Sequence, residues 1–149
     1  MSSFSLSADN PLFALYAVHA TLLVFKMFLV VVLTARQRFA KKVFANPEDA
    51  KGRSAKVKLD DPDVERVRRA HLNDLENIPA FLFVSFLYVA TNPNLALATT
   101  LFRAFTAARI LHTFVYAVKP LPQPARGLAF FVGLGTTIYM AVQVLIHFW

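Results

Sequence analysis

The chain has 149 residues, of which 56% are hydrophobic and 17% charged, with a formal net charge of +7 and no cysteine. A soluble domain usually carries about 25% charged and 45–50% apolar residues. The composition therefore excludes a disordered chain and an ordinary water-soluble enzyme, and the lack of cysteine excludes a disulfide scaffold, an iron–sulfur centre and a Cys nucleophile. It predicts one small integral membrane protein.

The first predicted helix spans about residues 11–40. Its apolar run over 11–35 exceeds the ~20 residues that cross a bilayer, and Asn10 followed by Pro11 is a typical helix start. A cleaved signal peptide is the alternative, but the apolar stretch is too long and no small-residue cleavage site follows it. The sequence therefore predicts a retained membrane helix.

A charged connection follows over residues 36–63, with its loop proper at about 41–61. Asp61 and Pro62 then predict the start of a second helix that extends to about residue 90. Only the second half of this helix is apolar. Pro79 lies within it and would either kink the helix or be accommodated by neighbouring helices.

The third predicted helix spans about residues 95–118, and a Pro-rich turn separates it from a fourth over about 124–148. The four predicted spans leave both termini on one side, with the long 36–63 connection and the Pro-rich turn on the other. The predicted fold is an all-α, up-down bundle of four transmembrane helices that forms a single domain over residues 1–149.

Positive charge is concentrated on one side of this predicted bundle. Eleven of the 16 Lys and Arg residues lie within residues 36–69, and all nine acidic residues lie at or before Glu76. The positive-inside rule places the 36–63 loop in the cytosol and both termini in the lumen. Long apolar runs flank the basic cluster, so nucleic acid is not an expected partner.

Polar side chains recur at helical spacing inside the predicted helices. Those on the second helix form one stripe: Glu65, Arg69, Asn73 and Glu76. Those on one face of the third helix are Arg109, His112 and Tyr116, and Arg126 opens the fourth. Charged groups inside a membrane are functional candidates by default, although such groups can also snorkel to the surface or pair with one another.

The ligand that these side chains suit is a small zwitterion rich in carboxylates, because arginine guanidinium groups match the geometry of carboxylates. Glutathione has two carboxylates, an ammonium group, and a thiol of the kind that this chain lacks. The histidines His71, His112 and His147 do not fall at ligand spacing on one helix, so no metal site is predicted.

A buried ion pair is predicted between Lys26 and Asp74. Asp74 lies about 180° around the second helix from Glu65, and therefore points away from the polar stripe. Both residues should lie at similar depths, roughly 15 and 18 Å from the cytosolic ends of their helices. Because either charge alone would be costly in lipid, we expect the two to pair.

Four segments resemble one known family. "VERVRRAHLNDLEN" at 64–77 resembles the signature of the MAPEG superfamily, the membrane-associated proteins in eicosanoid and glutathione metabolism. The segments "KVFANPEDA" (42–50), "ARILHTFVYAV" (108–118) and "PLPQPARGLAFFVG" (120–133) are similar to segments of family members, in the same order. The resemblance implies a homotrimer, with one glutathione site between neighbouring subunits near the cytosolic side.

The resemblance also implies roles for individual residues. Arg126 would hold the glutathione sulfur as a thiolate, because a nearby cation lowers the pKa of a thiol, and Asp49 is a weaker catalytic candidate. The expected glutathione contacts are Arg38, Arg69, Asn73, Glu76, His112, Tyr116 and Arg126, with Arg68 and His71 as second-tier contacts.

The implied activity is that of a glutathione S-transferase acting on hydrophobic electrophiles, with a glutathione-dependent peroxidase activity on lipid hydroperoxides. The alternatives are a glutathione-dependent prostaglandin E synthase and a non-catalytic, lipid-presenting protein. Leu72 and Gly127 stand where the prostaglandin-isomerising relatives carry Arg and Ser, which weakens the first alternative. Ala50 stands where some transferases carry a reactive Cys. The implied location is the endoplasmic reticulum membrane, with the mitochondrial outer membrane as a second candidate.

Overall fold

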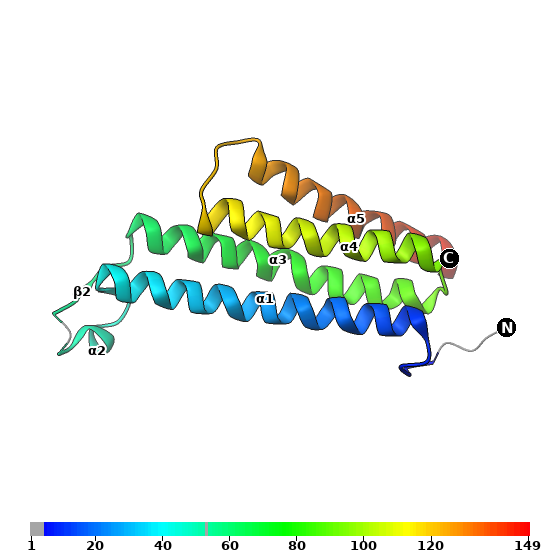
Figure 1. Cartoon of the computed structure of the whole chain (residues 1–149), viewed down its shortest axis with the longest axis horizontal. Helices are drawn as coiled ribbons and strands as arrows, with labels where there is room; N and C mark the ends of the chain where they lie inside the picture. The colour runs from blue at the N-terminus through cyan, green and yellow to red at the C-terminus, as the bar shows by residue number, and fades with distance from the viewer. Residues whose placement is uncertain (1–4, 53) are drawn as a thin grey trace.

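Four long helices lie side by side in the computed structural model, which describes residues 5–52 and 54–149 (Figure 1). α4 continues directly into a π-helical segment, η1. The helices are α1 (Pro11–Lys41), α3 (Pro62–Ala90), α4 (Leu95–Thr113), η1 (Phe114–Val118) and α5 (Ala125–Phe148). Their bounds lie within one residue of the expected ones, except that the last five residues of the expected third helix form the wider π-helical turn.

Side chains that accept hydrogen bonds fix where three of these helices begin. The Asn10 side chain accepts from the backbone N–H groups of Leu12 and Phe13, at 3.1 and 3.4 Å. Asp61 caps α3 in the same way, and Asn94 accepts from the third residue of α4. Such caps satisfy backbone donors that have no partner within the helix. α3 runs through Pro79 without a break.

The connection between α1 and α3 contains structure that the sequence analysis did not anticipate. Strands β1 (Val43–Phe44) and β2 (Lys56–Val57) pair in parallel, and the short helix α2 (Pro47–Ala50) lies between them. The Phe44 side chain is buried and meets the ring of Phe39 edge to face. This contact ties the connection to the end of α1.

An apolar core joins the four helices toward the end where α1 starts and α5 ends. Phe81 stacks on Phe105 with 3.7 Å between ring centroids, and meets Phe102 edge to face. Leu23 of α1 and Met140 of α5 are fully buried against this cluster. The packing therefore draws on all four helices.

Two of the helices, α1 and α5, are long and apolar enough to cross a membrane. Large apolar side chains project outward from them, including Phe25, Phe28 and Ile146, each at least 60% exposed. The start of α1 and the end of α5 lie at one end of the molecule, while α2 and β2 lie at the other (Figure 1). The described part of the chain is thus mainly helical, with large apolar side chains on the outer faces of α1 and α5.

Candidate functional site

A cationic cavity of about 350 Å³ lies where α3, η1 and the start of α5 meet. Its charged side chains are Arg66 and Arg69 of α3 and Arg126 from the first turn of α5, and no acidic residue is among the described residues that line it. The uncharged lining residues are Val115, Tyr116, Pro120, Leu121 and Pro122. Such a cavity suits an anionic ligand.

Arg126 is held in this cavity by an aromatic ring. Its guanidinium carbon lies 4.8 Å from the centroid of the Tyr116 ring, within the range of a cation–π contact. Its buried Nε has no hydrogen-bond partner among the described residues. Tyr116 belongs to η1, and π-helical turns are frequent at functional sites. The arrangement leaves a guanidinium with donor capacity at the start of a helix.

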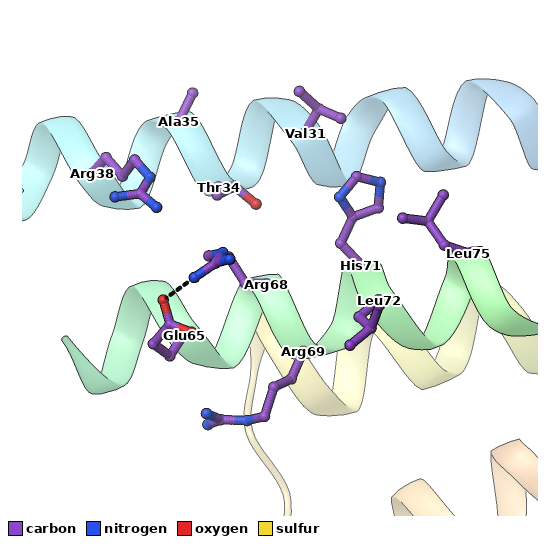
Figure 2. A pocket seen from close by; sticks show the side chains of 10 residues that line it. All are labelled: Val31, Thr34, Ala35, Arg38, Glu65, Arg68, Arg69, His71, Leu72 and Leu75. Carbon is purple, nitrogen blue, oxygen red and sulfur yellow. Dashed lines mark hydrogen bonds and ion pairs between the residues drawn. The ribbon is translucent and has the colours of Figure 1, made fainter. Parts of the chain in front are cut away.

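A second cavity, of about 500 Å³, opens between α1 and α3 (Figure 2). Arg38 of α1 and Arg68 of α3 point into the space between the two helices, and Glu65 accepts a 2.7 Å hydrogen bond from Arg68. Arg38 has a buried Nη1 with no partner in the described part of the chain. His71 also lines this cavity.

The expected glutathione contacts therefore divide between two sides of α3. Arg69 projects from the side of α3 that is turned away from α1, and it borders both cavities (Figure 2). Arg38, Arg68 and His71 belong to the α1–α3 side, whereas Arg126 and Tyr116 belong to the η1–α5 side. Within one copy of the chain, these residues do not converge on a single pocket.

The other expected site residues are not part of either lining. Asn73 is half-buried, and its side-chain oxygen accepts a 2.7 Å hydrogen bond from Arg109. His112 is buried, with its ring centroid 5.5 Å from that of Tyr116. Glu76 is exposed. Asp49 lies in α2 and accepts a 3.2 Å hydrogen bond from Asn46, apart from both linings.

The predicted pair of Lys26 and Asp74 is confirmed. The Lys26 ammonium contacts one carboxylate oxygen of Asp74, and both side chains are buried. The other oxygen accepts a 2.7 Å hydrogen bond from Nη2 of Arg109. Helical spacing alone groups Arg109 with His112 and Tyr116 and does not indicate this bond. The similar depth of Asp74 and Arg109 in the bundle is the feature of the sequence that could have indicated this second ion pair. We call Lys26, Asp74 and Arg109 the buried charge cluster.

No group of three or more His, Asp or Glu side chains in residues 5–52 and 54–149 could hold a metal ion. The ionisable side chains of the site are mainly arginines, which cannot lose their charge in a protein and which only donate hydrogen bonds. The chemistry of the site is thus that of anion binding.

Comparisons with known proteins agree with this chemistry. A model of the MAPEG family matches residues 16–146. The chain is 51% identical over 142 residues to rat microsomal glutathione S-transferase 1, covering 92% of this chain and 91% of the relative. The human protein of that name is 50% identical over 142 residues, with the same coverage. Prostaglandin E synthase of Macaca fascicularis is 39% identical over 146 residues, covering 97% and 95%.

These matches cover almost the whole chain, so the protein belongs to the MAPEG family of membrane proteins. Within that family it is more similar to the glutathione S-transferases than to the prostaglandin E synthases in this comparison.

Proposed function

We propose that this protein is a membrane-bound glutathione S-transferase. The observation that carries the proposal is the cationic cavity that contains Arg66, Arg69 and Arg126 without an acidic residue among its described lining. The identity of about 50% to microsomal glutathione S-transferase 1 over most of the chain supports the same activity. Glutathione is the cosubstrate, and no step in this chemistry needs a metal.

The proposed reaction begins with the thiol of glutathione. A free thiol has a pKa near 8.5, so little thiolate forms at neutral pH without a neighbouring cation. The Arg126 guanidinium and the positive end of α5 both favour the thiolate. The thiol proton passes to solvent, the sulfur attacks the electrophilic carbon, a carbon–sulfur bond forms, and a leaving group such as chloride departs with its electron pair.

The same thiolate can reduce a lipid hydroperoxide. Its sulfur attacks the terminal peroxide oxygen, the oxygen–oxygen bond breaks, and the lipid leaves as an alkoxide that takes a proton from solvent to become an alcohol. A second glutathione then displaces water from the sulfenic acid to give glutathione disulfide. Two glutathione molecules are oxidised for each hydroperoxide reduced. In this proposal hydrophobic substrates reach the site from the bilayer, where they concentrate.

A homotrimer of four-helix transmembrane subunits would complete the site. The division of Arg38 and Arg126 between two sides of α3 supports this proposal, because two faces of adjacent copies can meet around one ligand. Glutathione would then contact Arg38 and Arg68 of one copy and Arg69, Tyr116 and Arg126 of another. Asn73, Glu76, His112 and His71 would form the remainder of the shared site.

The proposed location is the endoplasmic reticulum membrane, with the mitochondrial outer membrane as a second compartment. In the proposed topology the connection between α1 and α3 faces the cytosol and the termini face the lumen. The concentration of Lys and Arg in residues 36–69 supports this orientation. Glutathione would enter from the cytosolic side, next to the cavities that bind it.

A prostaglandin E synthase activity is the alternative enzyme function, supported by the 39% identity to a protein of that name. Asp49, a catalytic candidate for this isomerase chemistry, hydrogen-bonds to Asn46 and lies apart from the cavity of Arg126. Leu72 and Gly127 also differ from the residues that the sequence analysis associates with isomerases. The transferase is therefore the preferred function.

A panel of activity assays on the purified protein tests the proposal. With glutathione present, we expect turnover of 1-chloro-2,4-dinitrobenzene and of a lipid hydroperoxide, and little isomerisation of prostaglandin H. Dominant isomerisation would favour the alternative enzyme. Absence of all three activities, together with absence of saturable glutathione binding in detergent, would favour a non-catalytic, lipid-presenting protein.

A further inference from the structure

Arg109 belongs to the buried charge cluster and also contacts Asn73, one of the expected glutathione contacts. It is fully buried, and its Nη2 donates 2.7 Å hydrogen bonds to Oδ1 of Asp74 and to Oδ1 of Asn73. Gly133 of α5 lies beside its side chain, where an added Cβ would be in ordinary van der Waals contact with the Arg109 Cδ at 3.6 Å. Arg109 therefore reaches from the interior of the bundle to the partly exposed Asn73.

One of the two cations in the buried charge cluster is enough to neutralise the carboxylate of Asp74. Lys26 and Arg109 together bring two positive charges to the single carboxylate of Asp74. Lys26 alone would leave a neutral buried pair, and a second buried cation carries a desolvation cost. The Arg109 atoms Nε and Nη1 have no hydrogen-bond partner in the described part of the chain. What Arg109 adds to the pair is its bond to Asn73.

That bond determines which way the Asn73 amide faces. A guanidinium only donates hydrogen bonds, so it must meet the carbonyl oxygen of the amide and not its NH₂ group. The Asn73 NH₂ group is then left on the other side of the amide as a donor. Asn73 lies one helical turn from Arg69, which borders both cavities.

We propose that Arg109 is a positioning residue of the glutathione site, which orients the Asn73 amide so that its NH₂ group donates to an oxygen of glutathione. This inference rests on the proposed glutathione transferase function. Arg109 itself does not touch the ligand. It acts through Asn73, while Lys26 keeps the carboxylate of Asp74 neutralised.

Two matched substitutions distinguish the effect of losing the Arg109–Asn73 bond from the effect of removing a buried cation. Arg109→Met and Lys26→Met each remove one cation and leave a neutral pair with Asp74, but only Arg109→Met removes the bond to Asn73. We expect Arg109→Met to raise the Kd for glutathione roughly tenfold, measured by equilibrium dialysis of the detergent-solubilised protein. Lys26→Met should leave the Kd within about twofold. Equal Kd values for the two variants would overturn the proposal.

A double-mutant cycle tests whether the effect passes through Asn73. In an Asn73→Ala background, Arg109→Met should cause no further rise in the Kd. Asn73→Asp keeps an acceptor for Arg109 but has no NH₂ group, so its Kd should rise as much as that of Asn73→Ala. An Asn73→Asp variant with the wild-type Kd, or a full tenfold effect in the Asn73→Ala background, would show that Arg109 does not position a donor.

Measurements on the wild-type protein and on a conservative variant distinguish failure of the proposed function from failure of the proposed role of Arg109. Wild-type protein that binds no glutathione would contradict the proposed function itself. Binding by the wild type together with equal effects of the two Met variants would contradict only the role of Arg109. If Arg109→Met does not fold, Arg109→Lys replaces it in the same cycle, because a single ammonium lacks the planar geometry of the guanidinium. A Lys variant with unchanged Kd would also contradict positioning.

Discussion

The two halves of the helical bundle differ in how they use polar residues. The half near the chain termini is held by apolar packing around Phe81, Phe102 and Leu23. In residues 77–108 and 127–149, Arg103 is the only Asp, Glu, Lys or Arg. The other half contains the buried charge cluster, the cationic cavity and the charged connection. Apolar packing in the first half stabilises the fold, whereas burial of charge in the second half costs free energy.

Burial of a side chain therefore has opposite effects on the free energy of folding in the two halves. A buried phenylalanine contributes favourable transfer and contact energy, so its loss should affect stability alone. A buried arginine or aspartate costs free energy unless its partners are present, so its loss should depend on which partner remains. Substitutions in the two halves should therefore separate stability from glutathione binding.

The largest effect is expected for Asp74→Asn. The substitution leaves the cations Lys26 and Arg109 buried together without a carboxylate, and unpairing a buried charge costs about 3–5 kcal/mol. We expect little folded protein to be recovered, measured by gel filtration and thermal unfolding in detergent. The control Asp60→Asn changes a carboxylate that is 85% exposed and should unfold like the wild type. Wild-type stability of Asp74→Asn would show that the cluster is not strongly coupled.

Phe81→Ala tests the apolar half. The side chain is fully buried in contact with two phenylalanine rings, and removal of such a side chain typically costs about 3–5 kcal/mol. The unfolding temperature should fall while the Kd for glutathione stays unchanged below that temperature. Phe83→Ala, at a site that is 67% exposed, is the matched control. A large change in the Kd would contradict the expectation that the apolar half affects stability and not glutathione binding.

Arg126→Ala and Arg126→Lys test the cationic cavity. If Arg126 stabilises the thiolate, kcat should fall at least tenfold, which corresponds to about 1.4 kcal/mol in the activation barrier. The ultraviolet absorbance of bound thiolate should fall with it, while the oligomeric state remains that of the wild type. Lys119→Ala removes an exposed cation from the adjacent turn and should leave both signals unchanged. Retention of rate and absorbance in both variants would assign Arg126 another role, such as anchoring α5 to lipid phosphates.

The smallest effect is expected for alkylation. The chain contains no cysteine, so maleimide treatment followed by removal of excess reagent should leave the transferase rate unchanged. A matched sample taken through the same steps without reagent is the control. An increase of several-fold would show that another nucleophile, such as a lysine of residues 41–58, regulates activity from the charged connection.

Helix boundaries could be predicted because their causes are local, and one long-range ion pair could be predicted by counting residues along two helices. A proline after Asn or Asp marks where α1 and α3 begin, and the side-chain caps confirm those positions. Lys26 and Asp74 could be paired from their similar depth and from the cost of an isolated charge in lipid. Depth requires only a residue count along each helix.

The arrangement of the site could not be predicted in the same way. Helical periodicity places Glu65, Arg69 and Asn73 on one stripe, but it does not fix how α3 is rotated against α1 and α4. The structure directs Asn73 to Arg109, and it divides the arginines between two cavities. The pairing of β1 and β2 was also missed, because two-residue strands carry too weak a pattern to detect.

The buried charge cluster has a consequence for the synthesis of the chain. Its members emerge from the ribosome in the order Lys26, Asp74 and Arg109, on α1, α3 and α4. In the proposed four-span topology, a nascent chain that has reached the end of α3 can already pair Lys26 with Asp74, so neither of these two charges has to enter the bilayer unpaired. In the same topology Arg109 arrives last, and its acidic partner Asp74 already lies on the hairpin of α1 and α3. We therefore expect the insertion of α4 to depend on that hairpin.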